Sequence, residues 1–408
     1  MTESQIRKCR RRLEQFLADL LELVGRTERR HWASVYIRGL MLDGERKSVE
    51  PMAARMPDGN VQAMQQLVGQ SPWEWNPVWE RLGRRMTAEL EPDSLWVVDD
   101  TGFPKQGPHS VGVARQYSGT LGKTGNCQVA VSLHHVGDHG SAVLGWRLYL
   151  PEEWTNDPRR MEEAGIPKHV VFKTKWQLAL EIVDQVRSWQ LPDRIVLADA
   201  AYGDVTEFRD ALEQRNLPYV VGVSSNLGVW GKPPKTSIPP KGDGPGRSPT
   251  HYDYGKQRPT NVKDLALKAK GWKKVRWRQG TKGWLESRFI ALRVRPSHGY
   301  VRGKPPHEEA WLLVEWPEGE PEPTKYFLSD LPVHYTLRRL VRLARSRWKI
   351  EQDYHQLKEE LGLDHYEGRG WLGWHHHMTL VMLAQAFLTL EAMRVKKNFW
   401  VDPAQDAP

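Results

Sequence analysis

The hydrophobic pattern of residues 94–223 changes between strand and helix, and this alternation limits the possible folds more than any other feature of the sequence. Strand-like apolar runs come first, at residues 95–98, 127–135 and 142–150. Helical patterns at residues 175–189 and 206–216 then alternate with strand-like runs at residues 194–198 and 219–223. Several strands followed by alternating helices and strands predict a mixed α/β layer.

Helical patterns dominate both ends of the chain. Apolar residues recur at helical spacing in residues 4–24, and further helices are expected at residues 32–41, 48–55, 60–69 and 73–90. Another helical pattern extends from residue 335 to about 361, and an apolar run follows at residues 378–393. Two polar residues interrupt that run, which is shorter than the roughly 20 apolar residues that span a bilayer. We therefore expect a core helix there and no membrane partner.

The chain has 408 residues, which predicts two to four domains. Residues 231–250 are rich in Pro, Gly and Ser and predict a loop, and the strand-like runs at residues 273–278, 284–294 and 310–316 predict a separate β-rich piece beyond it. The expected parts are a helical domain (1–90), for which the arginine cluster Arg10, Arg11 and Arg12 suggests DNA binding, the first part of an α/β core (91–228), a basic β-rich insertion (229–332), a C-terminal helical part of the core (333–395) and a tail (396–408).

Positive charge is concentrated in one stretch. The chain carries a net charge of +9, but residues 231–305 alone hold 19 Lys and Arg against 4 Asp and Glu, a net +15. Such a stretch is typical of a surface that neutralises phosphates, and interleaved aromatic side chains can stack on bases. The alternative is a basic face that only contacts solvent. The candidate DNA-binding residues here are Lys273, Lys274, Arg276, Trp277, Arg278 and Trp284.

Cysteine content and the first residues both favour an intracellular protein. Cys9 and Cys127 are the only cysteines, too few for a disulfide framework or a cysteine zinc site. Residues 1–12 are polar and end in three arginines, unlike a secretory signal.

Acidic residues stand at three positions where a metal site could form. Asp99 and Asp100 end the first apolar run, Asp199 follows the run at residues 194–198, and Glu351 lies in the long C-terminal helical pattern. Carboxylates at strand ends of an α/β sheet open into the crevice where ligands bind. Oxygen ligands of this kind suit Mg²⁺ or Mn²⁺, and two such ions catalyse phosphodiester cleavage.

The first acidic position is ambiguous. Neighbouring strand residues point to opposite faces, so only one of Asp99 and Asp100 can share a crevice with Asp199. The segment is also compatible with an ordinary turn that ends a strand.

Spacing places four residues of the C-terminal helical pattern on one stripe. In a continuous α-helix, Arg347, Glu351, Tyr354 and Lys358 lie within a narrow arc. The cations and the tyrosine could position the acid and contact DNA. A solvent-exposed helix with surface ion pairs has the same spacing.

Three segments in this order resemble a known family. Residues 97–107 contain an Asp-x-Thr pattern that begins at Asp99, and residues 196–203 end a strand with Asp199. Arg347, Glu351 and Lys358 match the signature Tyr-x2-Arg-x3-Glu-x6-Lys, although alanine replaces its tyrosine. The chain thus resembles the DDE transposases of bacterial insertion sequences, which have an RNase H-like catalytic domain.

The resemblance implies a fold and a set of site residues. The fold is α/β, with an RNase H-like mixed-sheet catalytic core, a β-rich insertion and an N-terminal helical domain. Asp99, rather than Asp100, would hold two Mg²⁺ (or Mn²⁺) ions together with Asp199 and Glu351. Arg347 and Lys358 would hold phosphates near the scissile bond, and Trp277 or Trp284 would stack on a displaced base.

The resemblance also implies an activity. Such an enzyme binds the terminal inverted repeats of its own element, cleaves there and joins the freed 3′ ends to target DNA, in a cut-and-paste reaction. We expect a homodimer on DNA, in the cytoplasm and associated with the nucleoid. Two other functions stay open: a catalytically inactive DNA-binding regulator derived from a transposase, and an RNase H-like nuclease without strand transfer.

Overall fold

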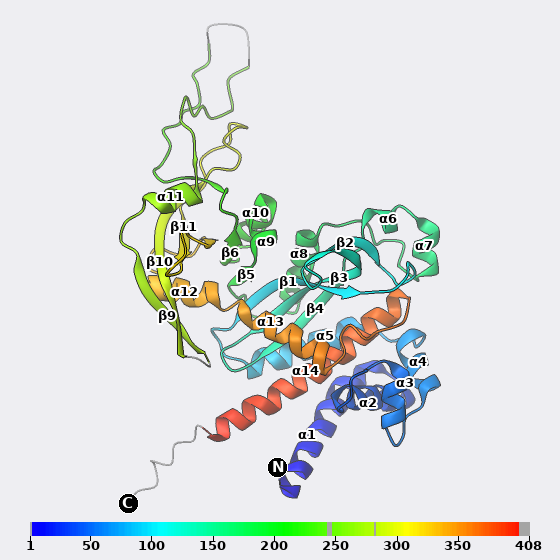
Figure 1. Ribbon diagram of the computed structural model, residues 1–408. Coiled ribbons are helices and arrows are strands. Elements are labelled where there is room, and N and C mark those ends of the chain that lie inside the picture. The colour runs from blue at the N-terminus through cyan, green and yellow to red at the C-terminus, as the bar shows by residue number, and fades with distance from the viewer. Residues whose placement is uncertain (1, 243–246, 281–282, 400–408) are drawn as a thin grey trace, which may run out of the picture. The chain divides into compact units, whose positions relative to one another are not determined.

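The computed structural model describes residues 2–242, 247–280 and 283–399 and divides into two compact units (Figure 1). The first unit comprises Met1–Asp193 and Lys349–Pro408, and the second comprises Arg194–Trp348. From residue 400 onward, the predicted tail lies outside the described residues. The fold is mixed α/β with an N-terminal helical region, as the sequence predicts.

Five helices form the N-terminal part of the first unit, close to the predicted positions. They are α1 (Glu3–Leu21), α2 (Thr27–Met41), α3 (Val49–Arg55), α4 (Val61–Gly69) and α5 (Trp75–Glu89). A capping box begins α1, in which Thr2 accepts from the Gln5 backbone and Gln5 accepts from that of Thr2. The helices bury their apolar faces, including Leu20, Ile37 and Trp79.

An antiparallel sheet lies next in the first unit. Its strands are β1 (Leu95–Pro104), β2 (Ala114–Ser118), β3 (Lys123–Val136) and β4 (Ser141–Leu148). The long strand β3 pairs with β1 on one side, and with β2 and β4 on the other. Because β3 is central, its residues from Cys127 to Val136 are buried on both faces.

The strand β1 is longer than the sequence predicts. The apolar run ends at Val98, but pairing continues from Leu95 opposite Val136 to Pro104 opposite Cys127. The prediction that Asp99 and Asp100 end the strand is therefore wrong. Backbone pairing with the long strand β3 extends β1 beyond its apolar residues, so both acids lie in the middle of a strand.

Helices cover this sheet and complete the first unit. The helix α8 (Lys175–Ser188) packs on β1, β3 and β4, after the short helices α6 (Glu152–Thr155) and α7 (Pro158–Glu163). After α13 (Trp348–His355), one π-helical turn spans Gln356–Glu360. The last helix is α14 (Trp371–Phe399).

The helix α14 is longer than the predicted core helix. Its segment Trp371–Val395 is long and apolar enough to cross a membrane, contrary to the sequence expectation, because it begins seven residues before Met378. However, 67% of its most apolar window is buried inside the protein. It packs against α2, α4, α5 and β4 (Figure 1), as a core helix does.

The second unit contains one mixed sheet. Its strand order is β5-β6-β12-β11-β10-β7-β8, and β9 also pairs with β10. These strands are β5 (Val196–Ala198), β6 (Tyr219–Val223), β7 (Gly228–Trp230), β8 (Thr260–Asn261), β9 (Lys273–Gly280), β10 (Gly283–Pro296), β11 (Ala310–Trp316) and β12 (Lys325–Ser329). Its helices are α9 (Ala200–Gly203), α10 (Thr206–Gln214), α11 (Val262–Lys268) and α12 (Leu337–Arg345).

The segment predicted as an insertion pairs with a strand that precedes it in the chain. The strand β12 pairs antiparallel with β6, with Leu328 opposite Val221, and so attaches the β9 to β12 strands to the sheet that begins with β5 and β6. This pairing joins segments about 100 residues apart, and local hydrophobic pattern carries no information about it.

Candidate active site

The acids of β1 face opposite sides of the sheet of the first unit. Ser132 of β3 lies opposite Asp99, and Val131 lies opposite Asp100. Directly paired residues of an antiparallel sheet share a face. The Asp100 carboxylate accepts a hydrogen bond from the ammonium of Lys175 on α8 at 2.8 Å, which places it on the face that α8 covers. Asp99 therefore shares the other face with Ser132.

The helix that carries Glu351 covers the face of Asp99. Tyr354 of α13 lies three residues after Glu351, on the same side of the helix. Its hydroxyl is 2.7 Å from the hydroxyl of Ser132. Burial, and next the negative charge of Asp99, raise the pKa of the Tyr354 phenol well above its usual value. The structure thus brings Asp99 and α13 together on one face of the sheet.

Buried polar contacts hold α13 in place on this sheet. His134 Nδ1 of β3 lies 2.8 Å from a carboxylate oxygen of Asp353, and the Ser141 hydroxyl donates to the other oxygen. The Lys349 ammonium donates to the Gly137 carbonyl at 2.6 Å. Asp353 and His134 are both buried. These contacts fix both the rotation and the axial position of α13, and hence the place from which Glu351 projects.

Tyr354 contacts protein on several sides. Its ring packs edge-on against His134 at 5.3 Å and lies 6.3 Å from Trp146, in addition to its hydrogen bond with Ser132. These contacts differ from the DNA contact expected for Tyr354 and favour a positioning role.

Lys358 lies in the π-helical turn and holds the end of β1. Its ammonium donates to the Gly102 carbonyl at 2.8 Å and to the Thr120 hydroxyl at 3.0 Å, and it lies 5.6 Å from the centre of the Phe103 ring. Burial lowers the pKa of this amine. The wider π turn reaches these groups after α13.

The predicted stripe of four residues on one continuous helix is wrong. Helix α12 ends at Arg345, Arg347 lies in the following turn, and α13 begins at Trp348. The hydroxyl of Ser346 donates to the Arg342 carbonyl at 2.7 Å, a contact that competes with the helical ladder. The π turn after His355 changes the helical phase again.

Asp199 lies in the second unit, directly after β5, as predicted. It caps α9, where its carboxylate accepts from the Ala201 backbone at 2.9 Å. Close backbone packing fixes this turn: a Cβ at Gly203 would lie 1.9 Å from the Gly222 carbonyl oxygen of β6. A glycine is therefore required at position 203.

The candidate DNA-binding residues of β9 and β10 differ in exposure. Trp277 packs against Phe289 and lies under the Arg345 guanidinium, while Arg278 stacks on Trp348 at 3.4 Å. Both side chains are therefore used in packing. Trp284 is 54% exposed.

The other three basic residues of β9 are exposed. Lys274 and Arg276 both pair with Glu286, at 2.5 and 2.7 Å, and Lys273 is exposed beside them. Of the two tryptophans expected to stack on a base, Trp284 is the one that the structure leaves accessible.

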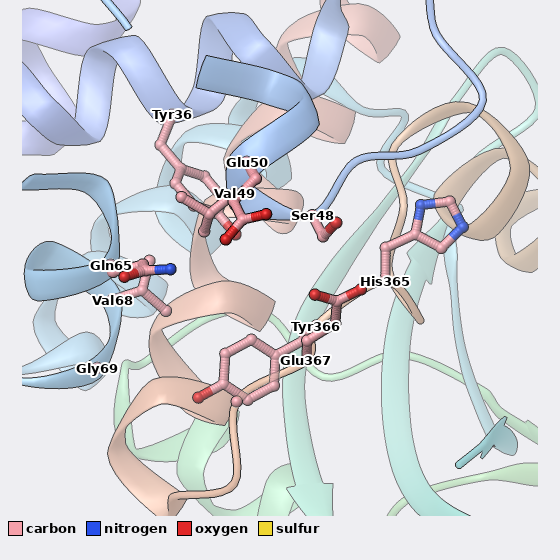
Figure 2. A pocket seen from close by; sticks show the side chains of 11 residues that line it. Tyr36, Ser48, Val49, Glu50, Gln65, Val68, Gly69, His365, Tyr366 and Glu367 are labelled. Atoms are coloured by element: carbon pink, nitrogen blue, oxygen red, sulfur yellow. The ribbon is translucent and has the colours of Figure 1, made fainter. Parts of the chain in front are cut away.

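The sequence analysis missed a second half-buried lysine beside the site. Lys105, just after β1, donates to the Tyr366 carbonyl at 2.6 Å, and burial lowers the pKa of its amine to about 8. The segment that contains Tyr366 borders a cavity of about 280 Å³. Tyr366 and Glu367 line this cavity together with Glu50 of α3 (Figure 2). Its described lining includes carboxylates and no Lys or Arg, so it does not suit DNA phosphates.

The acids supply only oxygen ligands. Asp99 and Glu351 in the first unit and Asp199 in the second are the candidate donors, and carboxylates fit Mg²⁺ or Mn²⁺ rather than a zinc site with soft ligands. No sulfur or imidazole ligand is part of this set.

Comparison with known proteins agrees with these features. Residues 19–284 match the family described as "DDE superfamily endonuclease". The chain is also 26% identical over 340 residues to "Probable transposase for insertion sequence element IS701" from Microchaete diplosiphon, covering 80% of this chain and 75% of the relative. Both findings confirm the resemblance to insertion-sequence DDE transposases, and the chain belongs to the DDE superfamily of endonucleases.

Proposed function

We propose that the protein is the transposase of an insertion sequence, which binds the element's terminal inverted repeats, cleaves there and transfers the freed ends to target DNA. The observation that carries this proposal is that α13, with Glu351, covers the face of β1 that presents Asp99. Membership of an endonuclease superfamily and similarity to an insertion-sequence transposase support it.

In this proposal, Asp99, Asp199 and Glu351 bind two Mg²⁺ or Mn²⁺ ions. When bound, such ions supply an activated water or 3′-hydroxyl and stabilise the leaving oxygen of the phosphodiester. The protein contributes by holding the helix that carries Glu351 in a fixed position. Contacts of Tyr354 with Ser132 and of Asp353 with His134 hold the helix of Glu351 against β3, the neighbour of the strand of Asp99.

The second unit would bind DNA. Lys273, Lys274 and Arg276 are exposed cations on β9, and Trp284 of the paired strand β10 is available for stacking on a displaced base. Arg347 would contact phosphates near the scissile bond. Lys358 already donates to Gly102 and Thr120, so its main role would be to position the end of β1. We further propose that the protein forms a homodimer on DNA, because two element ends must be brought together. We also propose that it is cytoplasmic and associates with the nucleoid.

The test is incubation with a labelled duplex that carries the end of the element, with Mg²⁺ or with EDTA. We expect metal-dependent cleavage at the end and a joined product with target DNA, both lost in Asp199→Ala and Glu351→Ala. Binding without cleavage under any metal would favour the inactive regulator. Cut ends without joined product would favour the simple nuclease.

A further inference from the structure

An open groove of about 600 Å³ lies in the second unit between residues 251–258 and 300–303. None of the residues that line it belongs to the DNA-binding set of β9 and β10. The two loops contact each other through the backbone, since the Tyr252 N–H donates to the Gly303 carbonyl at 2.7 Å. The Tyr254 hydroxyl also donates to the Lys304 carbonyl at 2.7 Å.

The second loop turns tightly at its glycines. Gly299 and Gly303 have φ values of +81° and +64°, in the region that favours glycine. A Cβ at Gly303 would lie 2.6 Å from the Cβ of His251. The walls of the groove are therefore set by close backbone packing.

Histidines fix the base of the same loop. The guanidinium of Arg209 lies 3.3 Å from His298 Nδ1, and His298 Nε2 lies 3.3 Å from the Asp210 carboxylate. His307 Nε2 donates to the His298 carbonyl at 3.1 Å. The ligand atoms of Asp210, His298 and His307 lie within 4.8 Å of one another. However, the adjacent arginine already donates to His298 and would repel a metal ion, so this cluster anchors the loop.

Two aromatic side chains that line the groove, Tyr254 and Tyr300, pack with Trp230. Trp230 stacks on Tyr254, and Tyr300 packs edge-on against both, with all three ring centres 5.7 Å apart. Trp230 and Tyr254 are each 6% exposed. This packing holds the Tyr300 ring in place before any ligand binds.

The groove carries excess positive charge. Arg258 and Arg302 line it, and Lys256 and Lys304 are exposed beside them. Across residues 2–242, 247–280 and 283–399, no carboxylate lies within ion-pair distance of these four cations. The one lining acid, Asp253, accepts from the Gly255 backbone at 2.8 Å. This charge complements a polyanion.

We propose that this groove is a second DNA-binding surface, which holds the backbone of the element-end duplex through one phosphate at Arg258 and one at Arg302. The proposal rests on the proposed function, in which the protein binds the end duplex of its own element, and it commits to that duplex as the occupant. The contacts are to phosphates and do not depend on base sequence.

The experiment measures binding of a labelled end duplex by fluorescence anisotropy, in EDTA, between 75 and 300 mM salt. Each lost phosphate contact reduces the slope of log K against log salt by about 0.9. The double variant Arg258→Gln/Arg302→Gln should therefore have a slope shallower by about 1.8. For each tenfold rise in salt, the association constant of the variant should fall about 60-fold less than that of the unsubstituted protein. Arg258→Lys/Arg302→Lys should retain most of the slope.

A matched control removes two positive charges elsewhere. Arg159 pairs with Glu163 and Arg187 pairs with Asp193 in the first unit, outside the predicted DNA-binding segments, so Arg159→Gln/Arg187→Gln gives the same change in net charge. An unchanged slope for the groove variant would overturn the proposal, and so would an equal loss in the control. If the protein binds DNA but never cleaves it with Mg²⁺, the proposed function fails while the slopes still decide the role of the groove.

Discussion

At the scale of single residues, two neighbouring acids on one strand have different surroundings. Asp100 pairs with Lys175 of α8. Asp99 shares its face with Ser132 and influences the titration of Tyr354. The sequence alone leaves the choice between them open. The strand register assigns each acid to a face, and the position of α13 favours Asp99 as the ligand.

We predict that Asp99→Asn reduces end cleavage by at least about 100-fold, because loss of a group that merely supports a metal ligand already costs 10–100-fold. Asp100→Asn should keep cleavage within about 10-fold and lower stability by about 1 kcal/mol, since Lys175 is partly solvated. Cleavage rates and thermal unfolding of both variants test this. Equal losses of activity in the two variants would contradict the assignment.

At the scale of elements, α13 depends on buried polar contacts with the sheet. His134 is fully buried and Asp353 nearly so, and their contact is 2.8 Å long. Removing one member of such a pair leaves a buried polar group without its partner, which is costlier than removing both.

We predict that His134→Asn or Asp353→Asn lowers the free energy of unfolding by about 3 kcal/mol, and that the double variant loses less than the sum of the two. Denaturant unfolding of the four proteins measures the coupling. Cleavage should fall in the single variants while affinity for the end duplex stays constant, because α13 positions Glu351. Additive losses of stability would show that the two side chains act independently.

Sequence patterns predicted most elements but not how they are joined. The helices of residues 3–89 and the strands β9, β10 and β11 lie near their predicted positions, because local periodicity defines them. The extension of β1, the pairing of β12 with β6 and the break between α12 and α13 depend on contacts between distant segments. The candidate acids were identified from the ends of strand-like runs and from the C-terminal helical pattern, whereas the packing of Trp277 and Tyr354 was not visible in any pattern.

At the scale of the whole molecule, buried histidines of α14 make the free energy of unfolding depend on pH. His375 and His377 lie in this helix, and burial lowers the pKa of each imidazole to about 3. Their bonds fit neutral rings: His375 Nδ1 donates to the Trp371 carbonyl, and His377 Nε2 donates to that of Gly362. Both rings are buried.

We predict that the protein loses stability as pH falls below about 6.5. The unfolded chain binds protons on these histidines near pH 6.5, whereas the folded protein does not until about pH 3, so each contributes a loss of about 2 kcal/mol between pH 6.5 and 5. Denaturant unfolding across this range should give a smaller pH dependence for His377→Gln. The exposed His139→Asn serves as the control, and an equal change in both variants would contradict the prediction.

The measurement that most directly tests the central claim is metal rescue of Asp199→Cys. A thiolate is a poor ligand for Mg²⁺ and a better one for Mn²⁺. If Asp199 binds the catalytic metal, this variant should bind the end duplex like the natural protein, lack cleavage with Mg²⁺ and regain it with Mn²⁺. Normal DNA binding with no recovery in Mn²⁺, or full cleavage with Mg²⁺, would contradict the account.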